Sequence, residues 1–555
     1  MKIPRVVSLL AVLPLLVMFA SAQDLKIGSG NTAFADPPVP RPHSQPCTVT
    51  LFKGYKFADF NPKSFNYTPP ASCPGPWARV ILAANFSVTK GRQFDRTANI
   101  WIGPTNIYFG TTSEPSKDVA RNWHIERDLT DYSSIFTTAQ QGTVDLGNLV
   151  DQTYTGVLHG TAKLLFYPLT PNQSAPVAAD QVIGFSAGPT GGTVALNTTT
   201  DLLAQTVTLP QNIQRAYFDV FAQSQSGDEF WYTCVPDDVA NELFSCPGTA
   251  FRESEVTIDG TPAGVAPVYP WIYTGGIDPY LWRPIPGVQT LNFQPYRVDL
   301  TPFAGLLDDG QPHTIALSVF NADSYFSATA SLLLYLDHNA TQLSGAITRN
   351  TLAVPDPKIT ENLHISPNGN LHGTVNSRSG HKFQISGYVN TSSGPVTTTL
   401  DQTVNFANLQ SFKITDTIYQ QDIKQETSIH AITTVRAGSG STVQTVNNDW
   451  PLHLDILETI NPDGSGALTT TIDQAYEQDT TVRQKGKLTF FGVVSNEVTP
   501  ADTLDFDSSG NITGNENQSS AQTYFSADST GYCYSRSIMA AAGLLTSITD
   551  GTACK

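Results

Sequence analysis

The sequence is poor in positive charge. Its 555 residues include 31 Lys and Arg against 48 Asp and Glu, which gives a formal net charge of -17, and the basic residues form no run. Nucleic acids and anionic membranes are bound through clustered positive charge. The composition therefore argues against nucleic acid and against a membrane surface as partners, and it favours a soluble, acidic protein.

Long helical periodicity is nearly absent as well. Only the segments 237–244 and 535–548 have a spacing of apolar residues that is typical of a helix. Elsewhere, short runs rich in Val, Ile, Thr, Tyr and Phe alternate with turn residues, and the chain contains 41 Gly and 37 Pro. This pattern predicts an all-β protein built from sandwiches, and the length predicts more than one domain.

Metal-binding and serine-nucleophile motifs are missing too. His364, His372 and His381 lie close together in the sequence, but turn residues separate them and no zinc-ligand spacing accompanies them. The segment "GFSAG" matches a nucleophile motif around Ser186, yet "PTGGT" follows it and cannot begin the helix that this motif requires. We therefore expect no metal, no cofactor and no serine nucleophile.

Cysteine is scarce, and the six cysteines fall as three pairs of sequence neighbours without a CxxC spacing. In an oxidising compartment, local pairing is the simplest of the possible connectivities. The predicted disulfides are Cys47–Cys73, Cys234–Cys246 and Cys533–Cys554.

The N-terminus predicts export. Residues 1–22 combine basic residues, an apolar stretch and the small residues Ala20-Ser21-Ala22 in the manner of a signal peptide, and no later stretch is apolar enough to cross a bilayer. Eight Asn-x-Ser/Thr sequons suit a glycosylated surface. They are Asn66, Asn85, Asn172, Asn197, Asn339, Asn390, Asn511 and Asn517. We therefore expect a secreted glycoprotein.

An internal similarity organises the rest of the chain. The segments "FDRTANIWIG" and "FRESEVTIDG" are each followed by an Asp-Leu-Thr motif, in "DLTDYSSIF" and "DLTPFAGLL". This repeat predicts two similar sandwiches, in residues 46–203 and 204–348, after an extended arm in residues 23–45. Beyond them, polar and apolar residues alternate over long stretches, which predicts an antiparallel β-rich domain with one wet face in residues 349–555.

The candidate chemistry consists of carboxylates placed beside aromatic residues. Such acids occur in "SQSGDEFWYTC", in "YPWIYTGGIDPYLWRPI", in "GTTSEPSKD" and at Asp95-Arg96, where a predicted strand begins. Sugars stack their C–H faces on aromatic rings and take charged hydrogen bonds through their hydroxyls. The residues therefore indicate a carbohydrate site but do not name a reaction, and a simple ion pair at Asp95-Arg96 stays an alternative.

The ordered segments "FDRTANIWIG", "TTSEP", "DLTDYSSIF", "GDEFWY" and "GGIDPYLWRPI" resemble the peptide-N-glycosidase A family of secreted amidases, over about residues 45–345. A more distant likeness is to the bacterial peptide-N-glycosidase F enzymes. The resemblance implies two tandem jelly-roll sandwiches packed side by side. It also implies hydrolysis of the amide bond between an Asn side chain and the first N-acetylglucosamine of an N-glycan. The partners would be N-glycosylated peptides and glycoproteins, and we expect a monomer.

The resemblance also assigns residues. Asp95 matches the catalytic carboxylate and Glu229 a second essential acid. The bacterial pattern has another glutamate where this chain has none, so Glu114 is a candidate replacement, and Arg283 stands in for an arginine expected where Pro279 lies. The predicted catalytic residues are thus Asp95 and Glu229, and the predicted substrate-binding residues are Arg96, Glu114, Trp231, Asp278, Trp282 and Arg283.

The expected chemistry follows from the amide, which is a poor electrophile. Asp95 would activate water, and Glu229, kept protonated by burial, would orient the sugar or assist the leaving nitrogen. Two alternatives stay open. Paired acids also serve endo-β-N-acetylglucosaminidases, and a lectin-like β-sandwich protein could bind the glycan without cleaving it.

Overall fold

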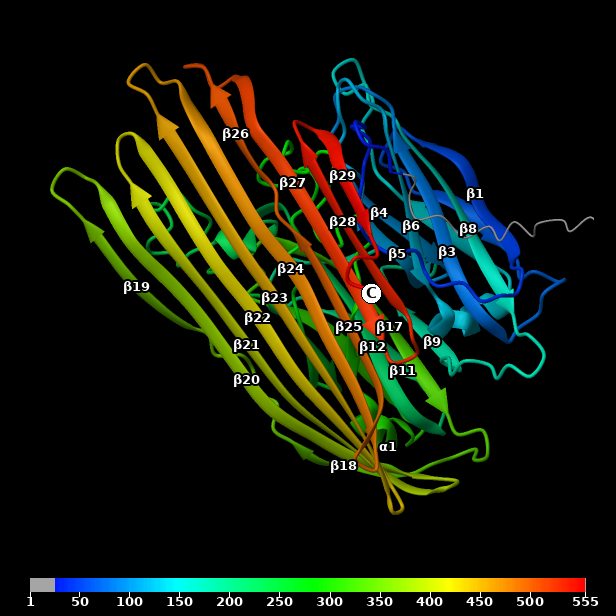
Figure 1. Ribbon diagram of the computed structural model, residues 1–555. Helices are drawn as coiled ribbons and strands as arrows, with labels where there is room; N and C mark the ends of the chain where they lie inside the picture. Colours follow the sequence, from blue (N-terminus) through cyan, green and yellow to red (C-terminus); the bar gives the residue numbers. More distant parts are fainter. Residues whose placement is uncertain (1–24, 555) are drawn as a thin grey trace, which may run out of the picture.

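The computed structural model describes residues 25–554, and the predicted signal peptide 1–22 lies outside this range. The described chain forms five antiparallel sheets, which confirms the all-β fold class. Figure 1 shows the arrangement, in which one sheet of long strands lies beside the more compact N-terminal part of the chain. Within residues 25–554, no helix is long and apolar enough to cross a membrane.

The first sandwich consists of two four-stranded sheets, with the orders β1-β8-β3-β6 and β2-β7-β4-β5. This winding, in which the first strand pairs with the eighth and the second with the seventh, is that of a jelly roll. Apolar side chains of both sheets form one core. The strands are β1 (Cys47–Phe57), β2 (Lys63–Tyr67), β3 (Trp77–Val88), β4 (Thr97–Ile102), β5 (Thr105–Thr111), β6 (Arg121–Asp128), β7 (Gln140–Asp145) and β8 (Leu158–Pro168).

The second sandwich repeats this order strand for strand, as β10-β17-β12-β15 and β11-β16-β13-β14. It is a second jelly roll. The short strand β9 (Gln181–Phe185) also pairs with β17, so β9 and β10 belong to this sandwich although they fall inside the range 46–203 predicted for the first. The other strands are β10 (Val194–Leu196), β11 (Leu203–Thr208), β12 (Ile213–Gln225), β13 (Glu253–Ile258), β14 (Thr261–Pro267), β15 (Tyr296–Asp299), β16 (Pro312–Phe320) and β17 (Tyr325–Leu336).

The repeated Asp-Leu-Thr motif plays the same structural part in both sandwiches. In residues 128–130 and in residues 299–301, the aspartate ends the sixth strand and accepts a hydrogen bond of 2.9 Å from the threonine N–H. The leucine N–H then donates to the third strand, to the carbonyl of Val80 at 2.8 Å and of Ala216 at 3.0 Å. Identical hydrogen bonds at equivalent positions support the predicted duplication.

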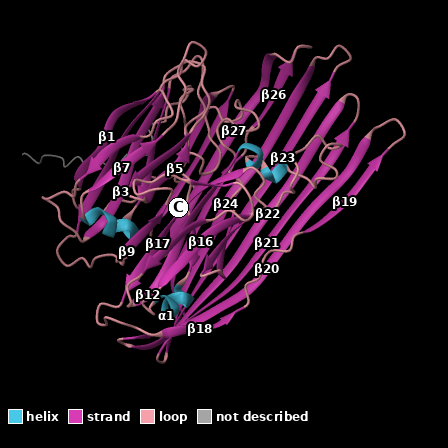
Figure 2. Cartoon of the chain, turned by 180° about the vertical axis from the view of Figure 1, so that it is seen from behind, coloured by secondary structure: helices cyan, strands magenta, loops and turns pink. Residues whose placement is uncertain are grey.

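The C-terminal sheet has 12 strands and follows the sandwiches in the sequence. Its side chains alternate between a buried and a more exposed face, as β21 shows clearly. The buried face shares one apolar core with the second sandwich, whereas the first sandwich has a core of its own. Figure 2 shows the long strands from behind. They are β18 (Gly345–Asn350), β19 (Lys358–Ile365), β20 (Leu371–Thr391), β21 (Gly394–Ile414), β22 (Ile418–Ala437), β23 (Gly440–Ile460), β24 (Gly466–Gln484), β25 (Lys487–Val498), β26 (Ala501–Phe506), β27 (Ile512–Asp528), β28 (Cys533–Ala541) and β29 (Leu544–Asp550).

The two predicted helices are not formed. Residues 535–548 lie in the hairpin β28–β29, whose turn places Ala542 and Gly543 at positive φ of 48° and 72°. Two adjacent residues at positive φ are typical of a tight hairpin turn, and pairing of β28 with β27 outweighs the helical propensity of the alanines. Residues 237–244 form turns inside the loop that the Cys234–Cys246 disulfide closes.

The N-terminal arm contains no strand or helix from residue 25 to residue 46. It runs between the first sandwich and the C-terminal sheet and bonds to both the sheet and the second sandwich. The N–H of Gly28 donates to Leu545 O at 2.7 Å, and the N–H of Ala33 donates to Pro284 O at 3.0 Å. The arm therefore ties together segments that are far apart in the sequence.

The cysteines depart from the prediction in one pair. Cys234–Cys246 and Cys533–Cys554 are disulfides, whereas Cys47 and Cys73 are free thiols, so the third predicted bridge is not formed. Burial and the neighbouring Cys47 raise the pKa of Cys73 to about 11, which keeps this thiol protonated. The asparagines of all eight sequons are exposed, so each is open to glycosylation, which stays a prediction.

Candidate active site

Asp95 lies directly before β4, at the junction of the two sandwiches. Its Oδ2 accepts a hydrogen bond of 3.0 Å from the N–H of Gly275, in the loop between β14 and β15, and a longer one of 3.5 Å from Thr274 Oγ1. A Cβ atom at position 275 would lie 2.5 Å from Asp95 Oδ1. Only glycine therefore lets the backbone of the second sandwich approach this carboxylate so closely.

A cavity of about 460 Å³ opens between the sandwiches beside Asp95. This volume lies within the range typical of small-molecule sites. Both sandwiches contribute walls, and the polar residues among them suit a hydroxyl-rich ligand. The lining residues include Phe60, Asp95, Arg96, Asn99, Asp145, Gln223, Gln225, Glu229, Tyr273 and Tyr325.

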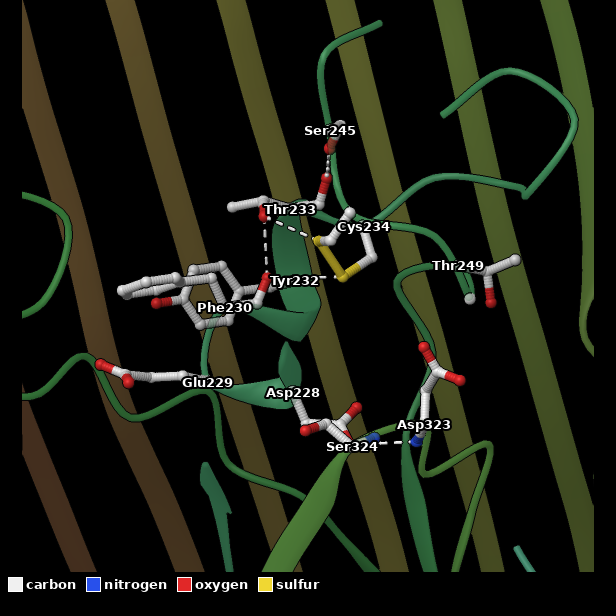
Figure 3. The surroundings of a disulfide bond; sticks show 12 residues. Asp228, Glu229, Phe230, Tyr232, Thr233, Cys234, Ser245, Thr249, Asp323 and Ser324 are labelled. Carbon is white, nitrogen blue, oxygen red and sulfur yellow. Dashed lines mark hydrogen bonds between the residues drawn. A yellow bond between two sulfur atoms is a disulfide. The ribbon is translucent and has the colours of Figure 1, made fainter. Parts of the chain in front are cut away.

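Glu229 reaches the same cavity from a loop that follows β12. Its neighbour Asp228 anchors this loop, because Asp228 is fully buried, accepts a hydrogen bond of 2.9 Å from Arg252 Nε, and accepts another of 2.8 Å from the Ser324 N–H. Figure 3 shows that the side chains of Asp228 and Glu229 point away from one another. Asp228 thus fixes the backbone, and Glu229 is presented to the cavity.

The disulfide Cys234–Cys246 lies just beyond Glu229 and holds the same loop. Closing a loop of 12 residues stabilises a fold by about 3 kcal/mol in the chain-entropy estimate. This bridge and the Asp228 anchor answer how the Glu229 loop is held in a chain that lacks two close cysteines around the acid.

The electrostatics of the cavity separate the two acids. Burial raises the pKa of Asp95, but the Gly275 N–H and the Arg96 guanidinium oppose this rise by stabilising the carboxylate. Burial and the negative charge of Asp95 together raise the pKa of Glu229 to about 7. A single negative charge is therefore better held on Asp95, and Glu229 keeps its proton up to neutral pH.

Arg96 is the third predicted residue at the cavity wall. Its Nη2 donates to Gln93 Oε1 at 2.9 Å, and its guanidinium lies over the ring of Phe60 at 5.6 Å. Its Nε has no hydrogen-bond partner among the described residues. Arg96 thus presents a positive charge with a spare donor next to Asp95.

Glu114 and Arg283 form an ion pair behind Asp95, outside the set of residues that line the cavity. Arg283 Nη2 lies 2.8 Å from Glu114 Oε1 and also donates to the carbonyl of Pro115 at 2.7 Å. Burial raises the pKa of Glu114 to about 8, against the opposing charge of Arg283. The pair joins the loop of Gly275 to the end of β5, so its structural contribution is to fix that loop.

The remaining three predicted substrate-binding residues do not reach the cavity. Trp231, Asp278 and Trp282 are each 1% exposed. Trp231 packs on Phe406 of the C-terminal sheet, and Trp282 Nε1 donates to the carbonyl of Gly276 at 2.9 Å. Packing inside the loop and against the C-terminal sheet therefore removes these side chains from direct contact with a ligand in the cavity.

Sequence reasoning missed three groups that build this site. They are the Gly275 N–H, the Asp228–Arg252 pair and Arg121, which is buried beside Glu114 and Arg283 with two nitrogens unpartnered among the described residues. The signal for the first was the Gly-Gly pair in "YTGGID", because consecutive glycines mark a close backbone approach. Arg121 carries no signal in the sequence, because its environment comes from distant segments.

The fold and the site define a double jelly-roll protein with an acid pair at the junction of its sandwiches. The chain belongs to the family described as "Peptide N-acetyl-beta-D-glucosaminyl asparaginase amidase A", whose model matches residues 37–353. The matched range covers both sandwiches and ends before all but the first strand of the C-terminal sheet.

The chain is 31% identical over 392 residues to "Peptide-N4-(N-acetyl-beta-glucosaminyl)asparagine amidase A" of Prunus dulcis, which covers 67% of each chain. Among solved structures, it is similar to PNGase F, a glycosylasparaginase from Flavobacterium meningosepticum. The identity is 12% and the TM-score 0.35, over 52% of this chain and 96% of that chain. A structure of PNGF-II gives an identity of 12% and a TM-score of 0.36, over 53% and 66%.

Proposed function

We propose that this protein is an amidohydrolase that cleaves the bond between an Asn side chain and the first N-acetylglucosamine of an N-glycan. It releases the whole glycan and converts the Asn to Asp. The observation that carries the proposal is the pair Asp95 and Glu229, which line one cavity and favour different protonation states. Membership of the amidase A family and the name of the Prunus dulcis relative support the same reaction.

In the proposed mechanism, Asp95 accepts a proton from a water molecule, whose oxygen bonds to the carbonyl carbon of the Asn side chain. The unpartnered Nε of Arg96 lies beside Asp95 and can stabilise the charge that develops on the carbonyl oxygen. Glu229 gives its proton to the sugar-linked nitrogen as the C–N bond breaks. The products are an Asp side chain and a glycosylamine, and the proton on Asp95 restores Glu229 by way of solvent.

The substrates that this mechanism requires are N-glycosylated peptides and glycoproteins. The mixed polar and aromatic lining of the cavity suits the first sugars of such a glycan. Export through the predicted signal peptide would place the protein where such substrates are abundant, and the eight exposed sequons fit the same route.

The test is mass spectrometry of a purified N-glycopeptide incubated with the protein at about pH 5 in water enriched in oxygen-18. We expect an Asp-containing peptide with one heavy oxygen and a released whole glycan. A peptide that retains one N-acetylglucosamine would instead assign the protein to the endoglycosidases. An untouched glycopeptide that binds to the protein would assign it to the lectin-like proteins.

A further inference from the structure

The loop that supplies Gly275 to Asp95 is held from a third side by the C-terminal sheet. This loop, residues 274–284, touches the first sandwich through two contacts, from Gly275 to Asp95 and from Arg283 to Glu114. On its other side lie β26 and β27 of the C-terminal sheet, which begin about 150 residues beyond the end of the family match. The contacts on that side come from two residues, Gln518 and Asp502.

Gln518 on β27 grips the loop by its backbone. Its Nε2 donates to the carbonyl oxygen of Tyr280 and, at 2.9 Å, to that of Arg283. One side-chain amide thus satisfies two carbonyls of an irregular loop, which have no strand partner of their own. The second of them belongs to the residue whose side chain pairs with Glu114.

Asp502 on β26 grips the loop by its side chain. Asp278 and Asp502 are 1% and 2% exposed, and their carboxyl groups are hydrogen-bonded to one another. Asp278 Oδ1 accepts from the Tyr280 N–H at 2.8 Å, and Asp502 Oδ2 accepts from Asn515 Nδ2 at 2.9 Å. The two remaining oxygens, Asp278 Oδ2 and Asp502 Oδ1, have no other partner among the described residues. Two carboxyl groups can make such a contact only while they share a proton.

We propose that Asp502 and Gln518 are positioning residues for the chemistry at Asp95, and that the C-terminal sheet is in this way a working part of the active site. They hold residues 274–284 in the conformation that directs the Gly275 N–H at the carboxylate, and the shared proton makes this hold depend on pH. The inference rests on the proposed amidase function. It gives a role to a region that lies outside the family match.

The direction of the pH dependence follows from the surroundings of the pair. Burial and the charge of Asp278 raise the pKa of Asp502 to about 7, and burial also raises that of Asp278. Arg283 is the charged group that opposes this near Asp278, while Asn515 is neutral. The folded chain therefore binds this proton more tightly than an unfolded chain, whose Asp pKa is about 3.9. The contact is made below about pH 7 and is broken as the pH rises further.

The decisive measurement is hydrogen exchange of the peptide that covers residues 274–284, corrected for intrinsic rates, at about pH 6 and about pH 8. We expect wild-type protection to fall at least tenfold at the higher pH. Asp502→Asn should keep it at both, because an amide in place of Oδ1 donates to Asp278 without a shared proton. Asp502→Ala should be unprotected at both. Wild-type protection in Asp502→Ala, or wild-type pH dependence in Asp502→Asn, would overturn the inference.

Activity provides the second readout. In Asp502→Ala and in Gln518→Glu, which turns the donor into an acceptor of the same shape, we expect kcat to fall about 10- to 100-fold with a smaller change in KM. Asp502→Asn should retain kcat, and Asp505→Asn on the same strand is the matched control. If the wild-type protein releases no glycan at all, the proposed function fails, and the exchange measurement still decides whether the C-terminal sheet holds the loop.

Discussion

At the scale of single residues, the site depends on which acid carries the charge. Asp95 receives a backbone N–H and lies next to a guanidinium, whereas no hydrogen bond or cation opposes the rise in the pKa of Glu229. The family resemblance predicted both acids and Arg96 at their positions in the sequence. It could not predict the contact from Gly275 to Asp95, because these residues lie 180 positions apart and meet only when the sandwiches pack together.

Asp95→Asn should lower kcat by about 10²- to 10⁴-fold, because an amide cannot take the proton of the attacking water. The fold should persist, since the Asn side-chain oxygen still accepts the Gly275 N–H. Single-turnover release of a glycan, measured beside thermal unfolding, checks both parts. Asp118→Asn at an exposed position is the matched control. Full activity in Asp95→Asn, or loss of the folded state, would refute the role given to this residue.

Glu229 should determine how activity falls at high pH. Because its pKa is raised to about 7, the protonated form is present below that pH and is lost above it, so kcat should decline with rising pH from about 7 upward. Glu229→Gln cannot donate a proton, so its kcat should be lower and should no longer decline. The pH profiles are best compared in the Asp502→Asn background, where the pair with Asp278 does not titrate. An unchanged decline in Glu229→Gln would assign the titration to another group.

At the scale of elements, the site is built from loops that rigid strands hold in place. The alternating strands and the repeated Asp-Leu-Thr motif could be read from the sequence, because both reflect local hydrogen bonds and side-chain periodicity. The alanine-rich segment 535–548 misled the prediction, since its pattern fits a helix until β27 offers it a partner strand. The two buried tryptophans misled it in another way, because aromatic rings serve loop packing as readily as sugar binding.

Gly275→Ala should damage the site without unfolding the protein. The new methyl group would lie 2.5 Å from Asp95 Oδ1 and must push the carboxylate or the loop aside. A displacement of this size can cost about 100-fold in rate. Gly188→Ala serves as the control, because its new methyl group would find no atom closer than 3.7 Å. Kinetics on a glycopeptide, together with thermal unfolding of both variants, tests the prediction, which fails if Gly275→Ala retains wild-type kcat.

At the scale of the whole molecule, the second sandwich is the central body. It shares its apolar core with the C-terminal sheet and shares the cavity with the first sandwich. The alternating pattern beyond residue 349 predicted the sheet and its wet face correctly. Its contacts with the 274–284 loop could not be predicted, because they join side chains more than 200 positions apart.

A buried ion pair should make the attachment of the C-terminal sheet stronger in acid. His381 Nδ1 lies 3.1 Å from Glu253 Oε1, and this contact raises the pKa of His381 above its usual value. A raised histidine pKa stabilises the folded state fully below about pH 6.5, and this stabilisation is lost as the pH rises through the folded-state value. In thermal unfolding between about pH 5 and pH 8, His381→Gln should therefore lower Tm most at the acidic end.

The exposed His364 provides the control, and His364→Gln should leave Tm close to that of the wild-type protein at each pH. A loss of stability in His381→Gln that is the same at every pH would point to packing in place of charge. Such a result would remove the ion pair from the account of how the sheet is attached.

The N-terminal arm has a consequence for the order in which the protein becomes active during its synthesis. The arm emerges from the ribosome first, yet Ala35 bonds to Gln522 and Gly28 to Leu545, which are made some 500 residues later. At a typical rate of about 5–20 residues per second, the arm waits on the order of half a minute or more for these partners. The grip of Gln518 on residues 274–284 comes equally late. We therefore expect nascent chains to fold both sandwiches well before they can deglycosylate anything, including their own sequons.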